Sequence, residues 1–135
     1  MKLNILILIF LSFNSLGPLW ANTKWVKIVE IKNKHVFYIN VNSINEEKGY
    51  IYFWELIDYS SLDEYGDHSA RIFIKGDCIN SRFKWKKIAY HKMPMARDEK
   101  EPKVPEKHMR NWHYPRDNST SKLVLDYACN AVGIS

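Results

Sequence analysis

Two runs of sequence decide the fold: HSARIFIK at residues 68–75 and SRFKWKKIAYHKM at residues 81–93. Apolar and polar residues alternate along the first run, and alternate residues of a strand point to opposite faces of a sheet. One side of this run is therefore apolar, with Ala70, Ile72 and Ile74, and the other is basic, with Arg71 and Lys75. This period of two predicts an antiparallel sheet with one apolar and one basic face.

The second run continues the pattern, because Phe83 and Trp85 alternate with lysines and an arginine. The alternation slips at Lys86 and Lys87, which predicts a β-bulge at that point. Together the two runs give a basic stripe made of Arg71, Lys75, Arg82, Lys84, Lys86 and Lys87.

Three further runs predict strands, because they are rich in β-branched and aromatic residues. They lie at residues 25–31, 35–41 and 50–59, and the short link at residues 32–34 indicates a hairpin between the first two. Gly76 and Asp77 are expected to end the strand that starts at residue 68. A short closing strand is expected at residues 112–114. The Pro-rich, highly charged segment 94–107 has no periodicity and predicts a loop that is either functional or mobile.

The C-terminal segment predicts one helix of about three turns. Its start is marked by the candidate N-caps Asn118, Ser119 and Thr120, and its end lies near Gly133. The apolar positions at helical spacing are Leu123, Val124, Tyr127, Ala128 and Ala131. Because the sheet offers the only large apolar surface, we expect an α+β fold in which this helix packs on one face of a single antiparallel sheet.

Residues 1–21 predict a secretory signal peptide. Lys2 precedes the apolar residues 5–11, polar and helix-breaking residues follow, and Ala21 provides a small residue at the expected cleavage site. The apolar stretch is too short for an N-terminal anchor to cross a bilayer. We therefore expect export to the periplasm or the cell surface, with residues 22–135 as one domain and no membrane segment after processing.

Cys78 and Cys129 are the only two cysteines. In an exported protein a lone pair of cysteines is normally oxidised, and two distant thiols make a poor metal site. The predicted disulfide would tie the C-terminal helix to the end of the fourth predicted strand.

Composition and the absence of known motifs argue against several classes of protein. Of the 135 residues, 5 are Trp, 8 Tyr and 6 Phe, which excludes a disordered chain. The formal charge of +5 would suit an acidic partner, but export makes nucleic acid an improbable one. No G-x-S-x-G, H-E-x-x-H or phosphate-binding glycine loop is present, so we expect neither an enzyme nor a cofactor.

Two clusters of side chains are candidate metal ligands. His108 and His113, with Met93, Met95 and Met109, carry donor types that suit copper in an exported protein, but their spacing is loose and methionine also fills cores. Asp63, Glu64 and Asp67 supply fewer oxygens than calcium needs, which favours a simple turn.

A set of residues spread over most of the chain has a recognisable order and spacing: Trp25, Tyr38-Ile39-Asn40, Ser43-Ile44, Trp54-x-Leu56-x-Asp58-Tyr59, Ser69-x-Arg71, Asp77-Cys78, Arg82, Trp112, Pro115, Ser119 and Cys129. In this respect the chain resembles the surface-adhesin protein E-like domains of bacterial envelope proteins. The resemblance implies about six antiparallel strands, a C-terminal helix held by a disulfide, and a surface or periplasmic location.

The same resemblance implies adhesion to host matrix and serum glycoproteins. It places the ligand-binding stretch at residues 68–82, where Ser69, Arg71, Cys78 and Asn80 match and Ile74, Lys75 and Gly76 depart. Combined with the basic stripe, it gives a predicted binding set of Ser69, Arg71, Lys75, Asn80, Arg82 and Lys84. The expected partner is an acidic glycoprotein, glycan or envelope surface. The alternatives are a structural or assembly component of the envelope, with a homodimer as one form, and a periplasmic copper or haem carrier.

Overall fold

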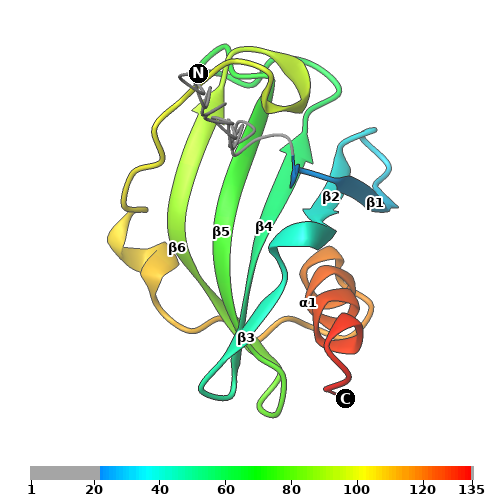
Figure 1. Cartoon of the computed structure of the whole chain (residues 1–135). Helices are drawn as coiled ribbons and strands as arrows, with labels where there is room; N and C mark the ends of the chain where they lie inside the picture. The colour runs from blue at the N-terminus through cyan, green and yellow to red at the C-terminus, as the bar shows by residue number, and fades with distance from the viewer. Residues whose placement is uncertain (1–21, 135) are drawn as a thin grey trace, which may run out of the picture.

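The computed structural model describes residues 22–134, so the predicted signal peptide at residues 1–21 lies outside the described residues. Within this range one antiparallel sheet of six strands is followed by one C-terminal α-helix (Figure 1). The strands are β1 (Trp25–Glu30), β2 (Val36–Asn40), β3 (Asn45–Glu47), β4 (Tyr50–Asp58), β5 (Ser69–Asp77) and β6 (Arg82–His91). The predicted fold class is confirmed.

Strands that follow one another in the chain mostly lie next to each other in the sheet and run antiparallel. The sheet runs β1-β2-β4-β5-β6, and the short β3 pairs with the start of β4. The predicted hairpin between the first two strands is present, whereas β3 was not predicted. Its sequence, Asn45-Glu46-Glu47, is polar and exposed, so it carries no alternation that would mark it as a strand.

The predicted strand end at Gly76 and Asp77 is wrong, because β5 continues through both residues. The position needs glycine for packing rather than for a turn. A Cβ atom at Gly76 would lie 2.8 Å from Ile51 Cγ1 and 2.8 Å from Leu125 Cδ1. Glycine therefore lets Leu125 of the helix pack closely against this end of β5.

The predicted bulge in β6 is confirmed. Phe73 pairs with Lys87 and Ile74 pairs with Trp85, which leaves Lys86 as the extra residue. The bulge restores Ile88 to the apolar side of the sheet, where it joins the core.

Helix α1 (Thr120–Ala131) begins where predicted, since the Ser119 hydroxyl accepts a hydrogen bond from the Lys122 amide at 3.2 Å. Its buried residues are Val124, Leu125, Ala128 and Cys129. Leu123 and Tyr127, which were expected on the buried stripe, are 44% and 38% exposed. The helix contacts β1, β2 and β4, and its buried side includes Leu125 and Cys129, which were not on the predicted stripe.

The core lies between α1 and one face of the sheet. Ile39, Ile51, Phe53, Ile72 and Ile74 pack there against the buried side of the helix. A disulfide joins Cys78, just after β5, to Cys129 in α1, with 5.9 Å between the two Cα atoms. The predicted covalent link between helix and sheet is confirmed.

The Pro-rich segment runs along the outer edge of β6 (Figure 1). Two isolated bridges hold the chain there: Lys103 pairs with Ile88, and His113 pairs with Phe83. The closing strand expected at residues 112–114 is therefore a single bridge. Backbone hydrogen bonds of Lys103 thus hold the segment against β6, and those of His113 hold the chain that follows it.

Candidate functional site

The face of the sheet opposite α1 carries aromatic and cationic side chains, and we call it the cation–aromatic face. Register explains the arrangement, because Tyr52 pairs with Lys75 and Trp54 pairs with Phe73 across β4 and β5. Cross-strand neighbours on one face touch. The face is made of Tyr50, Tyr52, Trp54, Arg71, Phe73, Lys75, Arg82, Lys84 and Lys87, and Trp112 stacks on Tyr50 from the adjoining segment.

Three cations converge on one ring at the end of this face. Arg82 Cζ lies 4.2 Å from the centre of the Trp112 ring, Lys84 Nζ lies 4.5 Å and Lys75 Nζ lies 5.9 Å from it. Lys75 Nζ is also 4.0 Å from the centre of the Tyr50 ring. We call these five residues the cation–aromatic cluster. Rings placed under the cations offset part of their mutual repulsion.

One carboxylate opposes this charge. Arg82 Nε donates to Asp77 Oδ2 at 2.8 Å, and Asn80 donates to the same carboxylate through its backbone and its side chain. Burial alone would raise the pKa of Asp77, but the hydrogen bonds from Asn80 and Arg82 outweigh it and hold that pKa below its usual range. Asp77 therefore stays ionised and fixes Arg82 beside Trp112.

Lys84 shows the local excess of positive charge. Its pKa is lowered, first by partial burial and then by the neighbouring charges of Lys75, Lys86 and Arg82. A negatively charged partner would relieve this repulsion, so the cluster is electrostatically suited to an anion.

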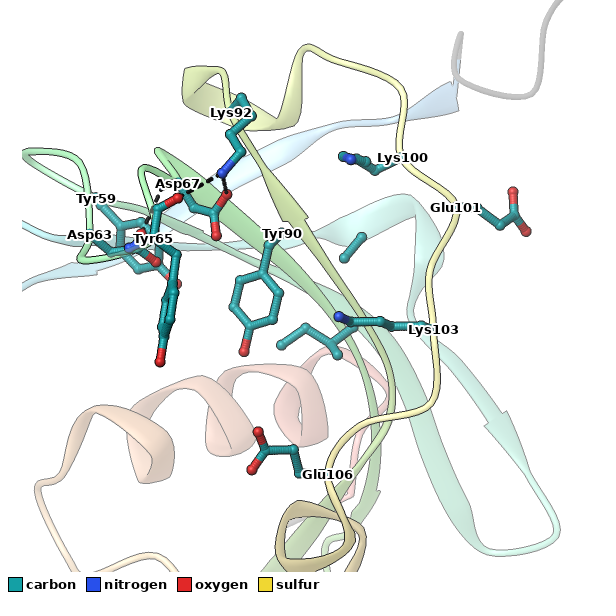
Figure 2. Close-up of a pocket in the computed structure, with 12 residues that line it drawn as sticks. Tyr59, Asp63, Tyr65, Asp67, Tyr90, Lys92, Lys100, Glu101, Lys103 and Glu106 are labelled. Atoms are coloured by element: carbon teal, nitrogen blue, oxygen red, sulfur yellow. Dashed lines mark hydrogen bonds and ion pairs between the residues drawn. The ribbon is translucent and has the colours of Figure 1, made fainter.

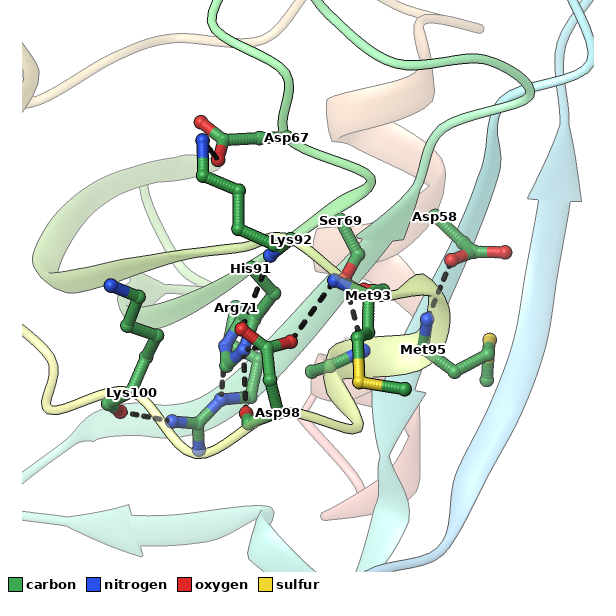
Figure 3. A network of polar contacts seen from close by, with 11 residues as sticks. Asp58, Asp67, Ser69, Arg71, His91, Lys92, Met93, Met95, Asp98 and Lys100 are labelled. Atoms are coloured by element: carbon green, nitrogen blue, oxygen red, sulfur yellow. Dashed lines mark hydrogen bonds and ion pairs between the residues drawn. The ribbon is translucent and has the colours of Figure 1, made fainter.

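Ser69 and Arg71 lie toward the other end of β5, inside a polar network (Figure 3). Arg71 Nε donates to His91 Nε2 at 3.0 Å, and the guanidinium also donates to the Lys100 carbonyl at 3.1 Å. His91 is fully buried, and its Nδ1 lies 2.9 Å from the Asp98 carbonyl oxygen. Burial, followed by the charge of Arg71, lowers the pKa of His91, which keeps the imidazole neutral as an acceptor for Arg71.

Ser69 is also fully buried, and it shapes the chain after β6. Its hydroxyl donates to the Met93 carbonyl at 2.7 Å and accepts from the Ala96 amide at 2.9 Å. Met95 and Ala96 both have positive φ, and the Met95 amide donates to Asp58 at 2.7 Å. These bonds stabilise a conformation that L-residues otherwise avoid.

The structure thus divides the predicted binding set. Lys75, Asn80, Arg82 and Lys84 lie together around Asp77 and Trp112. Arg71 precedes Lys75 on β5 by a distance of roughly 13 Å along the strand, and Ser69 lies roughly 7 Å further away. Trp112 was not in the predicted set, although it is one of the residues that carry the family resemblance.

Two of the candidate copper ligands, Met93 and Met95, lie apart from His113, and the acidic candidates for calcium form a turn. Met93 and Met95 lie beside Ser69, whereas His113 pairs with Phe83 at the far end of the sheet. The Asp63 carboxylate accepts hydrogen bonds from the Tyr65 and Asp67 amides at 2.9 and 2.8 Å, which confirms a turn. Among residues 22–134 no group of three His, Cys, Asp or Glu side chains is placed to hold a metal ion.

A cavity of about 750 Å³ lies beside β6 and was not predicted from the sequence (Figure 2). Tyr59, Tyr65 and Tyr90 line it together with charged side chains of both signs, and Lys92 closes one side by pairing with Asp67 at 2.8 Å. The lining residues come from three segments that are distant in sequence, so no local motif marks the cavity.

Comparison with known proteins agrees with this architecture. A family model described as surface-adhesin protein E matches residues 25–130. The chain belongs to the surface-adhesin protein E family. As a member it is an adhesin-like surface protein, which points to a binding function rather than an enzymatic one. Within residues 22–134, no helix has the length and apolar character needed to span a membrane.

A solved structure supports the family fold. Protein E of Haemophilus influenzae, in its crystal form II, superimposes with a TM-score of 0.59 at 16% sequence identity, covering 79% of this chain and 89% of that one. At this identity the match concerns the fold. No curated protein sequence matches the chain.

Proposed function

We propose that this protein is an exported adhesin-like module that binds an acidic macromolecule, such as an acidic glycoprotein, a glycan or an envelope surface, through its cation–aromatic face. The observation that carries the proposal is the convergence of Lys75, Arg82 and Lys84 on the Trp112 ring. Membership of the adhesin family supports a binding function, and the positive charges of the cluster support an acidic partner.

The division of labour within the site follows from the contacts. Lys75 and Lys84 have no ion pair among the described residues, so their charges are free for a partner. Asp77 holds Arg82 in place, and Asn80 donates hydrogen bonds to Asp77. Arg82 and Asn80 therefore help to position the cluster. Trp112 offers an apolar ring next to the cations, which suits the apolar face of a sugar or an aromatic side chain. Ser69 and Arg71 hold the loop at the other end of the face and are assigned a positioning role.

The test compares two double variants with the same change in charge. Lys75→Glu/Lys84→Glu alters the cluster, and Lys24→Glu/Lys32→Glu alters exposed lysines elsewhere. Retention on immobilised heparin, a sulfated glycan, is measured against salt concentration. We expect the cluster variant to elute at clearly lower salt, since exposed charge pairs contribute about 0.2–1 kcal/mol each and weaken with salt.

A matched loss in both variants would show that only net charge matters and would remove the cluster from the proposal. Trp112→Ala provides a second arm. This variant should bind an acidic glycoprotein more weakly than wild type does. The dependence of its binding on salt concentration should stay close to that of wild type, because the change removes contact area and no charge.

A further inference from the structure

A smaller cavity with a more apolar lining lies on the opposite side of the sheet, next to the first turns of α1. Its volume is about 130 Å³, and its walls come from β2, β4, β5, β6, α1 and Met109. Phe37, Phe53, Trp85 and Leu125 are among the side chains that line it. In the sequence these residues appear only as apolar positions of the core, so the sequence did not predict a cavity between them.

One charged group lines this cavity. Glu55 is 7% exposed, its side chain makes no hydrogen bond or ion pair with residues 22–134, and its carboxyl oxygens keep contact with the space of the cavity. It occupies an inward position of β4, between Phe53 and Ile57, where the sheet pattern calls for an apolar residue. A buried carboxyl without a partner costs stability, and an apolar residue of similar size would avoid that cost.

We propose that this cavity binds a small organic amine, consisting of a single aromatic ring or short alkyl chain with one ammonium group, and that Glu55 is its counter-ion. The volume of about 130 Å³ has room for one ring or short chain, since an enclosed protein cavity of about 150 Å³ accommodates benzene, and the open side of this cavity leaves space for the rest of the ligand. The aromatic walls favour a cation as well as an apolar body. The carboxylate provides the one charge-assisted hydrogen bond that would fix the ligand's orientation.

The electrostatic environment gives this site a distinctive pH dependence. Burial raises the pKa of Glu55 to about 8, so the empty site holds a neutral carboxyl at neutral pH. The other polar lining groups are the Ser121 hydroxyl and the Trp85 indole, and neither changes its charge with pH. Tyr59 is the nearby titratable group that responds to Glu55. Its own burial and surrounding negative charges raise the pKa of Tyr59 to about 12, so the phenol remains neutral. An ammonium ligand must therefore displace one proton from Glu55 when it binds.

The experiment is a titration of the purified, disulfide-bonded protein with benzylamine, followed by two-dimensional NMR. Benzyl alcohol and toluene serve as probes of similar shape without the charge. We expect benzylamine to perturb the resonances of Phe53, Glu55 and Leu125. Its affinity should increase about tenfold between pH 6 and pH 7, because one proton is released on binding.

Glu55→Gln keeps the shape of the side chain and removes its charge, and Glu46→Gln makes the same change at an exposed position of β3. We expect Glu55→Gln to weaken benzylamine binding at least tenfold and to leave toluene binding unchanged, whereas Glu46→Gln should behave as wild type. The pH dependence of the wild-type protein tests the proposal independently of any variant.

Three results would each overturn the inference. The first is that millimolar benzylamine perturbs no resonance of the protein. The second is that benzylamine and benzyl alcohol bind with equal affinity. The third is that Glu55→Gln leaves the affinity for benzylamine unchanged. None of them bears on the cation–aromatic cluster, which lies on the other face of the sheet.

Discussion

Replacing Glu55 by Gln should change how the stability of the protein depends on pH. In the folded protein burial raises the pKa of Glu55 from 4.5 to about 8. The folded state therefore keeps a proton that the unfolded state releases. Such a group contributes stability that is complete below pH 4.5 and is lost as the pH rises toward 8.

The size of the effect follows from these two pKa values. With one proton linked to folding, wild type should lose about 3–4 kcal/mol between pH 5 and pH 8 because of this carboxyl alone. Glu55→Gln cannot ionise and should lack this loss. His91, whose pKa is lowered first by burial, changes stability in the opposite sense, but it is present in both proteins and cancels in the difference.

Urea unfolding at pH 5, 6, 7 and 8, monitored by tryptophan fluorescence, measures the difference. For a domain of this size, about 3–4 kcal/mol corresponds to a shift of roughly 2–3 M in the urea midpoint. Glu46→Gln is the control and should track wild type at every pH. Parallel curves for wild type and Glu55→Gln would refute the reasoning, because they would show that Glu55 ionises in the folded state as easily as in water.

Three further changes test the packing. Removing the disulfide with Cys78→Ala/Cys129→Ala should cost about 4 kcal/mol in the chain-entropy account for a sequence separation of 51 residues, and a loss under 1 kcal/mol in urea unfolding would contradict that account. Gly76→Ala should cost about 1–3 kcal/mol by the same measurement, because the new methyl group meets Ile51 and Leu125; an unchanged midpoint would mean that the helix can move away freely. Ser69→Ala should cost about 2–3 kcal/mol by leaving the Ala96 amide and the Met93 carbonyl unpaired, and faster hydrogen exchange at Ala96 should accompany it.

Much of the fold could be predicted from the sequence because its signals are local. Alternation at residues 68–75 and 81–93 marks β5 and β6, and the slip at Lys86 marks the bulge. The N-cap Ser119 marks the start of α1. Features that depend on neighbours distant in sequence were missed. Gly76 signals a turn when considered alone, and only the approach of Leu125 explains why a strand continues through it.

The sequence predicted that the candidate site is basic, but it did not predict how the basic side chains are arranged. The alternation of lysine and arginine with apolar residues identified the basic face, but it could not show that Lys75 and Lys84 meet over Trp112, which follows a long loop. Nor could it separate Arg71, which the His91 network holds, from the cations around Asp77. Glu55 was overlooked because a single acid in an apolar run looks like an ordinary outward-facing position.

The hairpin that joins β5 to β6 links two parts of the molecule. Cys78 ties this hairpin to α1, and the adjacent Asp77 holds Arg82 in the cluster. Formation of the disulfide and assembly of the proposed binding surface therefore depend on neighbouring residues. We expect a newly made, still reduced chain to present a poorly ordered cluster, so that the proposed binding would develop only as the thiols are oxidised.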